Sequence, residues 1–357
     1  MAHGREDNAP PVTTSFENST SQPTVSSSQQ QSEDGRDDDH IEARVIDDGD
    51  SALGMEPNPL TTTAELSSSM LQYRTLHGRT YQSLQGTPEH WTPNDDTHLE
   101  SLDCSHHCLT LLLDNKLYLA PIPDGSIKVL DIGTGTDFAD THPYAEVIGT
   151  DISPSQPEWV PPNLRFEIED CTQPWTYPEN TFDFVHLRYL FGSIPDCDAL
   201  YAEAFRACNP GGWAEACDVS VNLQSDDGSV REGTALYEWG LLFNEASSRA
   251  GRSMSMVDDG TIVGSFERAG FKNIWSGIFK LPASPWARDM KHKELGAFCR
   301  LALEQDLDGY AMYLFTNFLD WTREQVVVYL ARVRRELRDM TMHPYFNVQV
   351  VYGQKPT

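Results

Sequence analysis

Basic side chains are scarce in this sequence. Its 357 residues include 26 Lys and Arg against 54 Asp and Glu, which gives a formal net charge of −28. Because binding of the nucleic-acid backbone requires clustered Lys and Arg, we expect no direct contact with nucleic acid. No apolar run is long enough to span a bilayer, and the polar start, residues 1–11, has no apolar signal core. We therefore expect neither membrane insertion nor secretion.

Cysteine is also sparse and irregularly spaced. An odd count of seven is not typical of a disulfide framework and predicts reduced thiols in the cytoplasm or the nucleus. Cys104, His106, His107 and Cys108 resemble a metal cluster. On a helix, however, only Cys104 and Cys108 share a face, and no second Cys/His pair follows at zinc spacing. No metal site is expected.

Large apolar residues are few in residues 1–70. This segment is rich in Ser, Gln and Asp, and residues 1–60 hold 13 acidic and 3 basic side chains. Burial of so little apolar surface cannot offset the entropy lost on ordering, so we predict a disordered acidic tail. The alternative is a segment that folds on a partner protein. Residues 71–357 are predicted to form the folded domain.

Short apolar runs alternate with helical patterns in that domain. Runs of this kind are typical of strands buried on both faces, and their alternation with helices indicates βαβ units. The predicted strands are Lys128–Ile132, Glu146–Thr150, Leu164–Ile168, Phe182–Leu187, Trp213–Val221 and Phe346–Gly353, and the predicted helices are Leu102–Leu119, Asp198–Cys208 and Thr322–Met340. The pattern predicts an α/β, Rossmann-like fold with a doubly wound, mostly parallel sheet and an antiparallel last strand.

Glycines and acids follow the first three predicted strands in a fixed order. Ligands of open α/β sheets lie at the carboxyl ends of strands, where glycine admits a close approach and carboxylates can hold ribose hydroxyls or an amino group. The candidate residues for this role are Asp131, Gly133, Thr134, Gly135, Asp151, Asp170 and Cys171. The order suits an adenosine-containing cofactor, either a nicotinamide dinucleotide or S-adenosylmethionine. A turn at Asn209-Pro210-Gly211-Gly212 and the closing strand order favour methyl transfer over hydride transfer.

Several segments are specific enough to indicate a family. From about Tyr81 to the C-terminus the chain resembles the LaeA-like methyltransferases of filamentous fungi. The segments that carry the resemblance are His106-His107, Leu117–Ile122, Val129–Gly135, Phe138–Asp151, Trp159–Asn163, Trp175–Pro178 and His186–Leu190. The resemblance implies a class I methyltransferase fold and S-adenosylmethionine as cofactor, with Gly133, Gly135, Asp151 and Asp170 among its binding residues. It also implies a methyl acceptor that is a small secondary metabolite or a protein side chain.

The cofactor loop departs from the family pattern. In the family a further glycine and several helical residues follow Gly-Thr-Gly-Thr, whereas here Thr136 leads directly into Asp137. The 12 residues from Gly133 to Tyr144 still suffice for a parallel crossover. We predict a short helix from about Asp137 to His142, capped by Thr136 and packed mainly through Phe138.

Three explanations of the short loop are open. They are an incorrect splice prediction, a loop that still binds the cofactor, and a regulatory or scaffold protein that no longer catalyses. A different reaction on the same fold, such as a cyclisation assisted by S-adenosylmethionine, is a further alternative. Partner proteins of a regulatory kind are compatible with each of them.

Two further groups of residues invite functional hypotheses. His186 lies near the end of the fourth predicted strand, where it could act as a base toward a hydroxyl acceptor or simply pack as a structural histidine. Residues 230–320 are predicted to form a helical insertion over the acceptor pocket. Its aromatic side chains are interpreted either as core or as a lid, and include Trp239, Phe243, Trp286, Tyr310, Tyr313 and Phe315.

Overall fold

The computed structural model describes residues 73–82, 90–133, 137–153 and 160–357. The predicted tail, residues 1–70, lies outside this part of the chain. The helices are α1 Asp96–Leu112, α2 Asp137–Thr141, α3 Cys197–Ala207, α4 Ala235–Arg249, α5 Thr261–Ala269, α6 Met290–Phe318 and α7 Arg323–Arg338. The strands are β1 Arg74–Leu76, β2 Arg79–Tyr81, β3 Lys128–Ile132, β4 Glu146–Asp151, β5 Leu164–Ile168, β6 Phe182–Arg188, β7 Cys208–Val219, β8 Lys272–Pro282 and β9 Tyr345–Gln354.

Seven strands form one sheet in the order β5-β4-β3-β6-β7-β9-β8. The strands from β5 to β7 pair in parallel, and β9 runs antiparallel to both β7 and β8. The predicted α/β sheet with an antiparallel last strand is therefore confirmed. One correction concerns the segment 230–320: within it, β8 is an edge strand of the sheet rather than part of a helical insertion. The sequence Lys272–Pro282 was missed because it has no continuous apolar run and most of its residues are not buried.

Apolar side chains on the two faces of the sheet build separate clusters. Leu130, Ile148 and Val185 pack with residues of α3 and α5 on one face. On the other face, Val129 and Phe184 pack with Phe138 of α2 and with the segment 117–122. Alternate residues of one strand thus bury opposite faces, as expected for a sheet covered on both sides.

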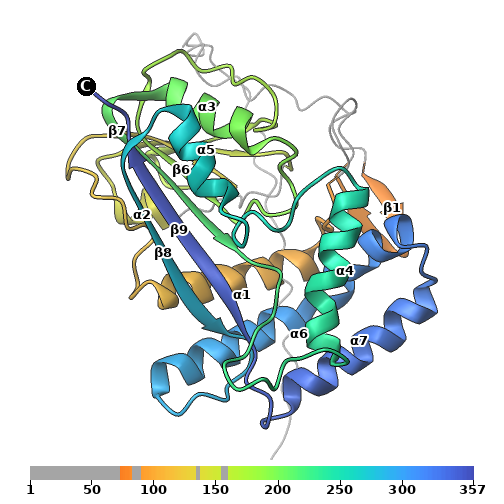
Figure 1. The fold of residues 1–357 in the computed structure, drawn as a ribbon. Coiled ribbons are helices and arrows are strands. Elements are labelled where there is room, and N and C mark those ends of the chain that lie inside the picture. Colours follow the sequence, from red (N-terminus) through yellow and green to blue (C-terminus); the bar gives the residue numbers. More distant parts are fainter. Residues whose placement is uncertain (1–72, 83–89, 134–136, 154–159) are drawn as a thin grey trace, which may run out of the picture. The chain divides into compact units, whose positions relative to one another are not determined.

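The remaining helices form a group of their own. Figure 1 shows α1, α4, α6 and α7 near one end of the long strands β8 and β9, and α6 contacts α1, α4, α7 and β8. Their shared core contains five of the six aromatic residues that sequence analysis singled out, namely Trp239, Phe243, Tyr310, Tyr313 and Phe315. No helix in the described ranges is long and apolar enough to cross a membrane.

Two predicted boundaries were wrong for identifiable reasons. The first long helix begins at Asp96, where the Asp95 carboxylate accepts a hydrogen bond from the His98 amide, and it ends at Leu112 rather than Leu119. Asp114 and Asn115 end it early because both adopt positive φ angles of 58° and 61°. Asn209 to Gly212 lie inside β7, where Phe182 pairs with Cys208 and Phe184 with Trp213, so the predicted turn is a bulge.

The short helix after the cofactor loop was predicted closely. It spans Asp137–Thr141. The Phe138 side chain is 3 % exposed and packs against Val129 and Phe184 of the sheet. Phe138 stacks on His142, with ring centroids 4.4 Å apart, and also contacts Phe184 and Tyr118. The predicted N-cap, Thr136, lies outside the described residues. One aromatic side chain therefore does most of the packing that a longer helix would share.

Candidate active site

A cavity of about 710 Å³ lies at the carboxyl ends of β3, β4 and β6. Four of the residues predicted to bind a cofactor line it, namely Gly133, Asp151, Asp170 and Cys171. Two others, Thr134 and Gly135, lie outside the part of the chain that the structure describes. Asp131 and His186 are not among the lining residues. The opposite wall comes largely from α1 and from the segment before it.

Gly133 is held in a conformation and a space that only glycine fits. Its φ is +76°, its amide donates to the Thr150 carbonyl over 3.0 Å, and a Cβ atom there would lie 2.9 Å from the Arg188 carbonyl oxygen. A side chain at this position would therefore combine backbone strain with a steric overlap. The close approach keeps the ends of β3 and β6 together at the cavity wall.

Asp151 ends β4 with its carboxylate at the cavity. The amide of Ser153 donates to its Oδ1 atom over 2.8 Å. Burial raises the pKa of Asp151 to about 6, although the amides of Ser153 and Ile152 favour the charged form. A ligand with hydroxyl donors would stabilise the ionised carboxylate further.

Asp170 presents an acceptor that has no partner. Its Oδ1 atom accepts from the amide and the hydroxyl of Thr172, over 2.9 and 2.7 Å. Its Oδ2 atom is buried and unpaired among the described residues. Beside it, burial raises the pKa of the Cys171 thiol to about 12, so this side chain is neutral. An unpaired buried oxygen is costly, and it suits a ligand that brings an N–H donor.

Asp131 and His186 form a pair within the sheet. They are register partners on β3 and β6, and the Nδ1 atom of His186 lies 2.8 Å from Oδ1 of Asp131. His186 is 4 % exposed, stacks on Phe184, and has a buried Nε2 atom without a partner in the described chain. A catalytic role for His186 stays a prediction, and this placement supports a positioning role instead.

Sequence analysis missed a cluster of amides at the same cavity. Gln82, just after β2, and Asn94, just before α1, meet the hydroxyl of Ser153: its Oγ atom donates to Gln82 Oε1 over 3.1 Å, and Asn94 Nδ2 lies 3.3 Å from it. Gln82 Nε2 and Asn94 Oδ1 remain buried without partners in the described structure. No spacing in the sequence links these residues, which lie up to 71 positions apart.

Charged groups occupy the wall of the cavity near the cofactor loop. The Nε2 atom of His106, on α1, lies 2.7 Å from Oδ2 of Asp137 at the start of α2. The hydrogen bond from His106 lowers the pKa of Asp137 and outweighs the effect of burial. Arg188 donates from Nη2 to the His106 carbonyl over 3.2 Å. These contacts connect α1, α2 and the end of β6.

The cysteine and histidine residues of α1 do not converge. His107 packs edge-on against Phe298, with ring centroids 4.4 Å apart, while Cys108 is buried in the helical core. Within the described ranges, no three His, Cys, Asp or Glu side chains lie close enough to hold a metal ion. All seven cysteines are free thiols.

Comparison with known proteins assigns the chain to a family. The family model described as a methyltransferase domain matches residues 105–275. The methyltransferase pytC of Aspergillus terreus is 34 % identical over 304 residues, which cover 83 % of this chain and 92 % of pytC. The chain belongs to the LaeA-like methyltransferases.

Other members of the LaeA-like group are comparably similar. The probable methyltransferase tdiE of Emericella nidulans is 34 % identical over 73 % of this chain and 83 % of its own length. The protein-methionine methyltransferase laeA of the same fungus is 28 % identical over 81 % of this chain and 78 % of its own. Among solved structures, a phosphoethanolamine N-methyltransferase of Haemonchus contortus matches 70 % of this chain and 52 % of that one, at 18 % identity and a TM-score of 0.41.

The chain is therefore an S-adenosylmethionine-dependent methyltransferase, and its cavity can be tested against that cofactor. Asp170 offers an unpaired buried acceptor, which suits an amino group. The space above Gly133 admits no Cβ atom. The Asp151 carboxylate lies between these two features along the cavity wall and is the natural acceptor for hydroxyls. The acceptors of the LaeA-like chain thus fit the adenosine part of the cofactor.

Proposed function

We propose that this methyltransferase acts on a small molecule rather than on a protein side chain. One observation carries the proposal: a single cavity joins Gly133, Asp151 and Asp170 to an aromatic end formed by Phe191 and Tyr310. The aromatic end lies beneath α1 and α6, so a substrate must enter a chamber walled by helices. Chambers of this kind bury most of the surface of a small ligand.

The cofactor is proposed to bind at the strand ends. Asp151 accepts hydrogen bonds from the ribose hydroxyls, and the Oδ2 atom of Asp170, which has no partner among the described residues, accepts from the adenine amino group. Gly133 lines the same cavity at the end of β3, beside the methionine end. Gln82 Nε2 and Asn94 Oδ1, which have no partner among the described residues, extend the polar wall beside Ser153. When bound, S-adenosylmethionine supplies a methyl group attached to a positively charged sulfur.

The chain contributes mainly by positioning and by excluding water. Tyr189 follows β6 directly, with a φ of 62°, which directs the chain from the cofactor wall into the aromatic wall. A strained backbone conformation of this kind persists only where the surrounding structure enforces it. Holding two reactants in line accounts for much of the rate of a simple transfer, so no general base is required.

Labelled cofactor tests the proposal. The full chain is incubated with S-adenosylmethionine carrying a tritiated methyl group and with an extract of a filamentous fungus, separated into fractions above and below about 3 kDa. We expect label in organic molecules of the small fraction, with none in protein. Label transferred only to protein would overturn the choice of acceptor and would favour the activity named for the laeA relative.

A catalytically impaired regulatory or scaffold protein is the second candidate. Its support is the five-residue length of α2, which leaves little helix beside the cofactor. Inserting a glycine and one helical turn after Thr136 separates the two. If the short loop is functional, the insertion leaves transfer unchanged or lowers it; if catalysis has been lost, only the chain with the insertion transfers label.

We also propose a location and partners for this chain. The seven free cysteines support a reducing compartment, the cytoplasm or the nucleus. The methyl acceptor is the partner that the family requires. Regulatory protein partners stay a prediction. The absence of direct nucleic-acid contact also stays a prediction, which rests on the charge of −28.

A further inference from the structure

A second, smaller chamber continues the main cavity between the helices. Its volume is about 60 Å³, and it lies at the ends of β6 and β7 beneath α1, α4 and α6. The side chains deepest in it are apolar and include Val221, Trp239, Phe243 and Leu281. These residues are 1 to 5 % exposed, so the chamber is part of the helical core.

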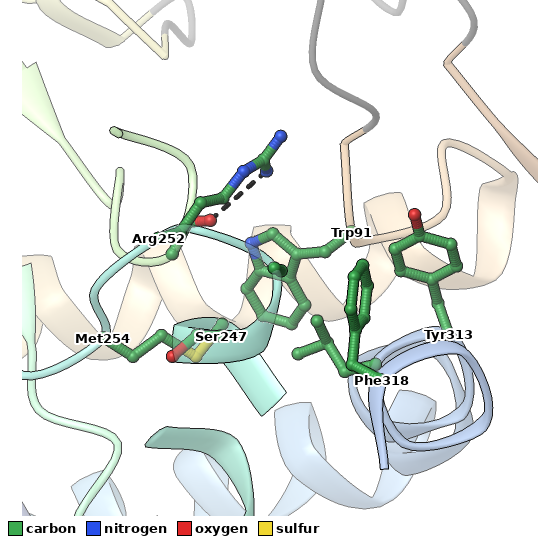
Figure 2. Close-up of a pocket in the computed structure, with 9 residues that line it drawn as sticks. Trp91, Ser247, Arg252, Met254, Tyr313 and Phe318 are labelled. Atoms are coloured by element: carbon green, nitrogen blue, oxygen red, sulfur yellow. Dashed lines mark hydrogen bonds between the residues drawn. The ribbon is translucent and has the colours of Figure 1, made fainter. Parts of the chain in front are cut away.

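The two cavities share one wall. Six residues line both of them, namely Trp91, Ser105, Leu109, Tyr189, Phe191 and Tyr310. Trp91 also lines a third pocket of about 170 Å³. Figure 2 shows its indole ring in the middle of that pocket, with Arg252 and Met254 on one side and Tyr313 and Phe318 on the other. Trp91 thus lines all three of these pockets.

Hydroxyl groups gather where the chamber meets the main cavity. The Ser101 hydroxyl donates its single proton to the Ala302 carbonyl over 2.7 Å, so the Tyr310 hydroxyl, 3.1 Å away, donates to Ser101. The Ser105 hydroxyl donates to the Ser101 carbonyl over 3.0 Å. Tyr310 and Ser105 have therefore used their protons and present only lone pairs. Burial raises the pKa of Tyr310 and of the adjacent Tyr189, so both phenols stay protonated.

This arrangement selects for a hydrogen-bond donor. Tyr189 lines the same wall and can donate its one proton to Tyr310 or Ser105. These two hydroxyl oxygens carry more lone pairs than that proton can satisfy, so among the described hydroxyl groups acceptors are in excess. Such an acceptor suits an O–H or N–H group on a ligand. Beyond it, the chamber is lined mostly by apolar side chains, with Ser220 and the thiols of Cys108 and Cys299 among them.

The size of the chamber limits the group that can enter. A cavity of about 150 Å³ holds benzene, so one of 60 Å³ holds a branched alkyl group of about three carbons and no ring. We propose that the acceptor molecule carries an O–H or N–H donor followed by a compact branched alkyl group, which occupies the chamber lined by Val221, Trp239 and Phe243. The proposal rests on the proposed small-molecule activity and adds the chemical class of the acceptor.

Isobutanol carries an isopropyl group one carbon away from a hydroxyl, so it is a direct probe of this chamber. Its binding to the full chain, saturated with S-adenosylhomocysteine, is measured by saturation-transfer NMR. Isobutyl methyl ether has the same alkyl group without the O–H donor and is expected to bind about tenfold more weakly. Cyclohexylmethanol retains the O–H donor, but its ring is too large for the chamber. We therefore expect no saturation-transfer signal from it at equal concentration.

A larger side chain in the chamber should compete with the alkyl group, and a matched variant outside the chamber provides the comparison. Ala302→Val places two more carbons against the chamber and is expected to weaken isobutanol binding at least tenfold, since each displaced methylene is worth roughly fourfold. Ala311→Val is the matched control, because Ala311 is buried in the same helix and lines none of the three cavities. The control is expected to bind isobutanol as the original chain does.

A titration with S-adenosylhomocysteine on the same samples separates this inference from the proposed function. If both variants bind S-adenosylhomocysteine normally and Ala302→Val alone loses isobutanol, the chamber is the alkyl site. Equal binding of isobutanol by Ala302→Val and the original chain, or equal binding of the alcohol and its ether, would overturn the inference while leaving the cofactor site intact. If the unaltered chain does not bind S-adenosylhomocysteine, the proposed function itself is contradicted.

Discussion

Arg79 and Asp306, 227 residues apart, hold the N-terminal hairpin against α6. The Nη1 and Nη2 atoms of Arg79 donate to the two carboxylate oxygens of Asp306 over 2.6 and 3.0 Å, and the same guanidinium also bonds to Asp95, the N-cap of α1. Asp306 further accepts from His98 and from the Gly309 amide, where the backbone of α6 is kinked. One buried carboxylate thus joins three elements that surround the cavity.

Removing that carboxylate should destabilise the domain. Asp306→Ala leaves Arg79 and His98 without a buried partner, and we expect the free energy of unfolding to fall by about 3 kcal/mol in urea denaturation. Asp308→Ala is the control, because the Asp308 side chain is 48 % exposed and pairs with Arg334 at the surface. Equal losses in the two variants would contradict a special role for Asp306.

The pH dependence of this contribution follows from the pKa of Asp306. Burial opposes the charged form, but the hydrogen bonds from His98 and Arg79 outweigh it, so the pKa lies below its usual value. The stabilisation is present above the pKa of an unfolded aspartate, near 4, and is lost as the pH falls through the lower, folded value. The difference in stability between the original chain and Asp306→Asn should therefore shrink in acid, and a difference that grows below pH 4 would contradict this assignment.

Cofactor affinity should itself depend on pH through Asp151. The pKa of this carboxyl is raised to about 6 by burial, and the proposed contact with the ribose hydroxyls requires its ionised form. Affinity for S-adenosylhomocysteine should therefore rise by about tenfold per pH unit up to pH 6 and level off above it. Calorimetric titrations between pH 5 and 8 measure this, and Asp151→Asn should flatten the profile. A flat profile in the original chain would show that Asp151 is not the titrating ligand.

Gly133 provides a steric test with a matched control. Gly133→Ala must adopt a φ of +76° and place its Cβ 2.9 Å from the Arg188 carbonyl, so we expect lower stability and the loss of S-adenosylhomocysteine binding. Gly228→Ala meets the same strain, with a φ of +72°, but its Cβ has open space. It should cost about 1 kcal/mol and leave binding unchanged. Normal binding by Gly133→Ala would exclude a cofactor in contact with this loop.

The role of His186 can be determined by comparing two substitutions. His186→Ala leaves the buried Asp131 carboxylate without this partner, and we expect about 3 kcal/mol of lost stability together with weaker S-adenosylhomocysteine binding. His186→Asn keeps a donor near the position of Nδ1 and should recover most of both. If His186→Ala instead folds and binds normally but transfers no methyl group, the residue acts as a base.

The sequence predicted those parts of the site that depend on local order along the chain. The apolar runs place Gly133, Asp151 and Asp170 directly after parallel strands, and the carboxyl ends of such strands meet at one edge of the sheet. The same periodicity identified Phe138 as the packing residue of α2. Prediction succeeded where a residue's role follows from its place in a strand or a short helix.

Contacts between distant segments could not be predicted in this way. The amides of Gln82 and Asn94 reach Ser153 only after the hairpin folds back over β4, and nothing in their spacing indicates the contact. The edge strand β8 was missed because its exposed face breaks the apolar pattern. Tyr310 could be recognised as buried but not as the wall between two cavities, because that depends on how α1 and α6 pack.

We expect the chain to bind S-adenosylmethionine despite its short cofactor loop. Isothermal titration of the full chain with S-adenosylhomocysteine tests it most directly, with Asp151→Ala measured alongside. We predict saturable binding of one molecule per chain, weakened at least tenfold by Asp151→Ala, since a carboxylate hydrogen bond to a buried ligand is worth about 1.5–3 kcal/mol. No heat of binding by the unaltered folded chain, or equal binding by the variant, would contradict the account.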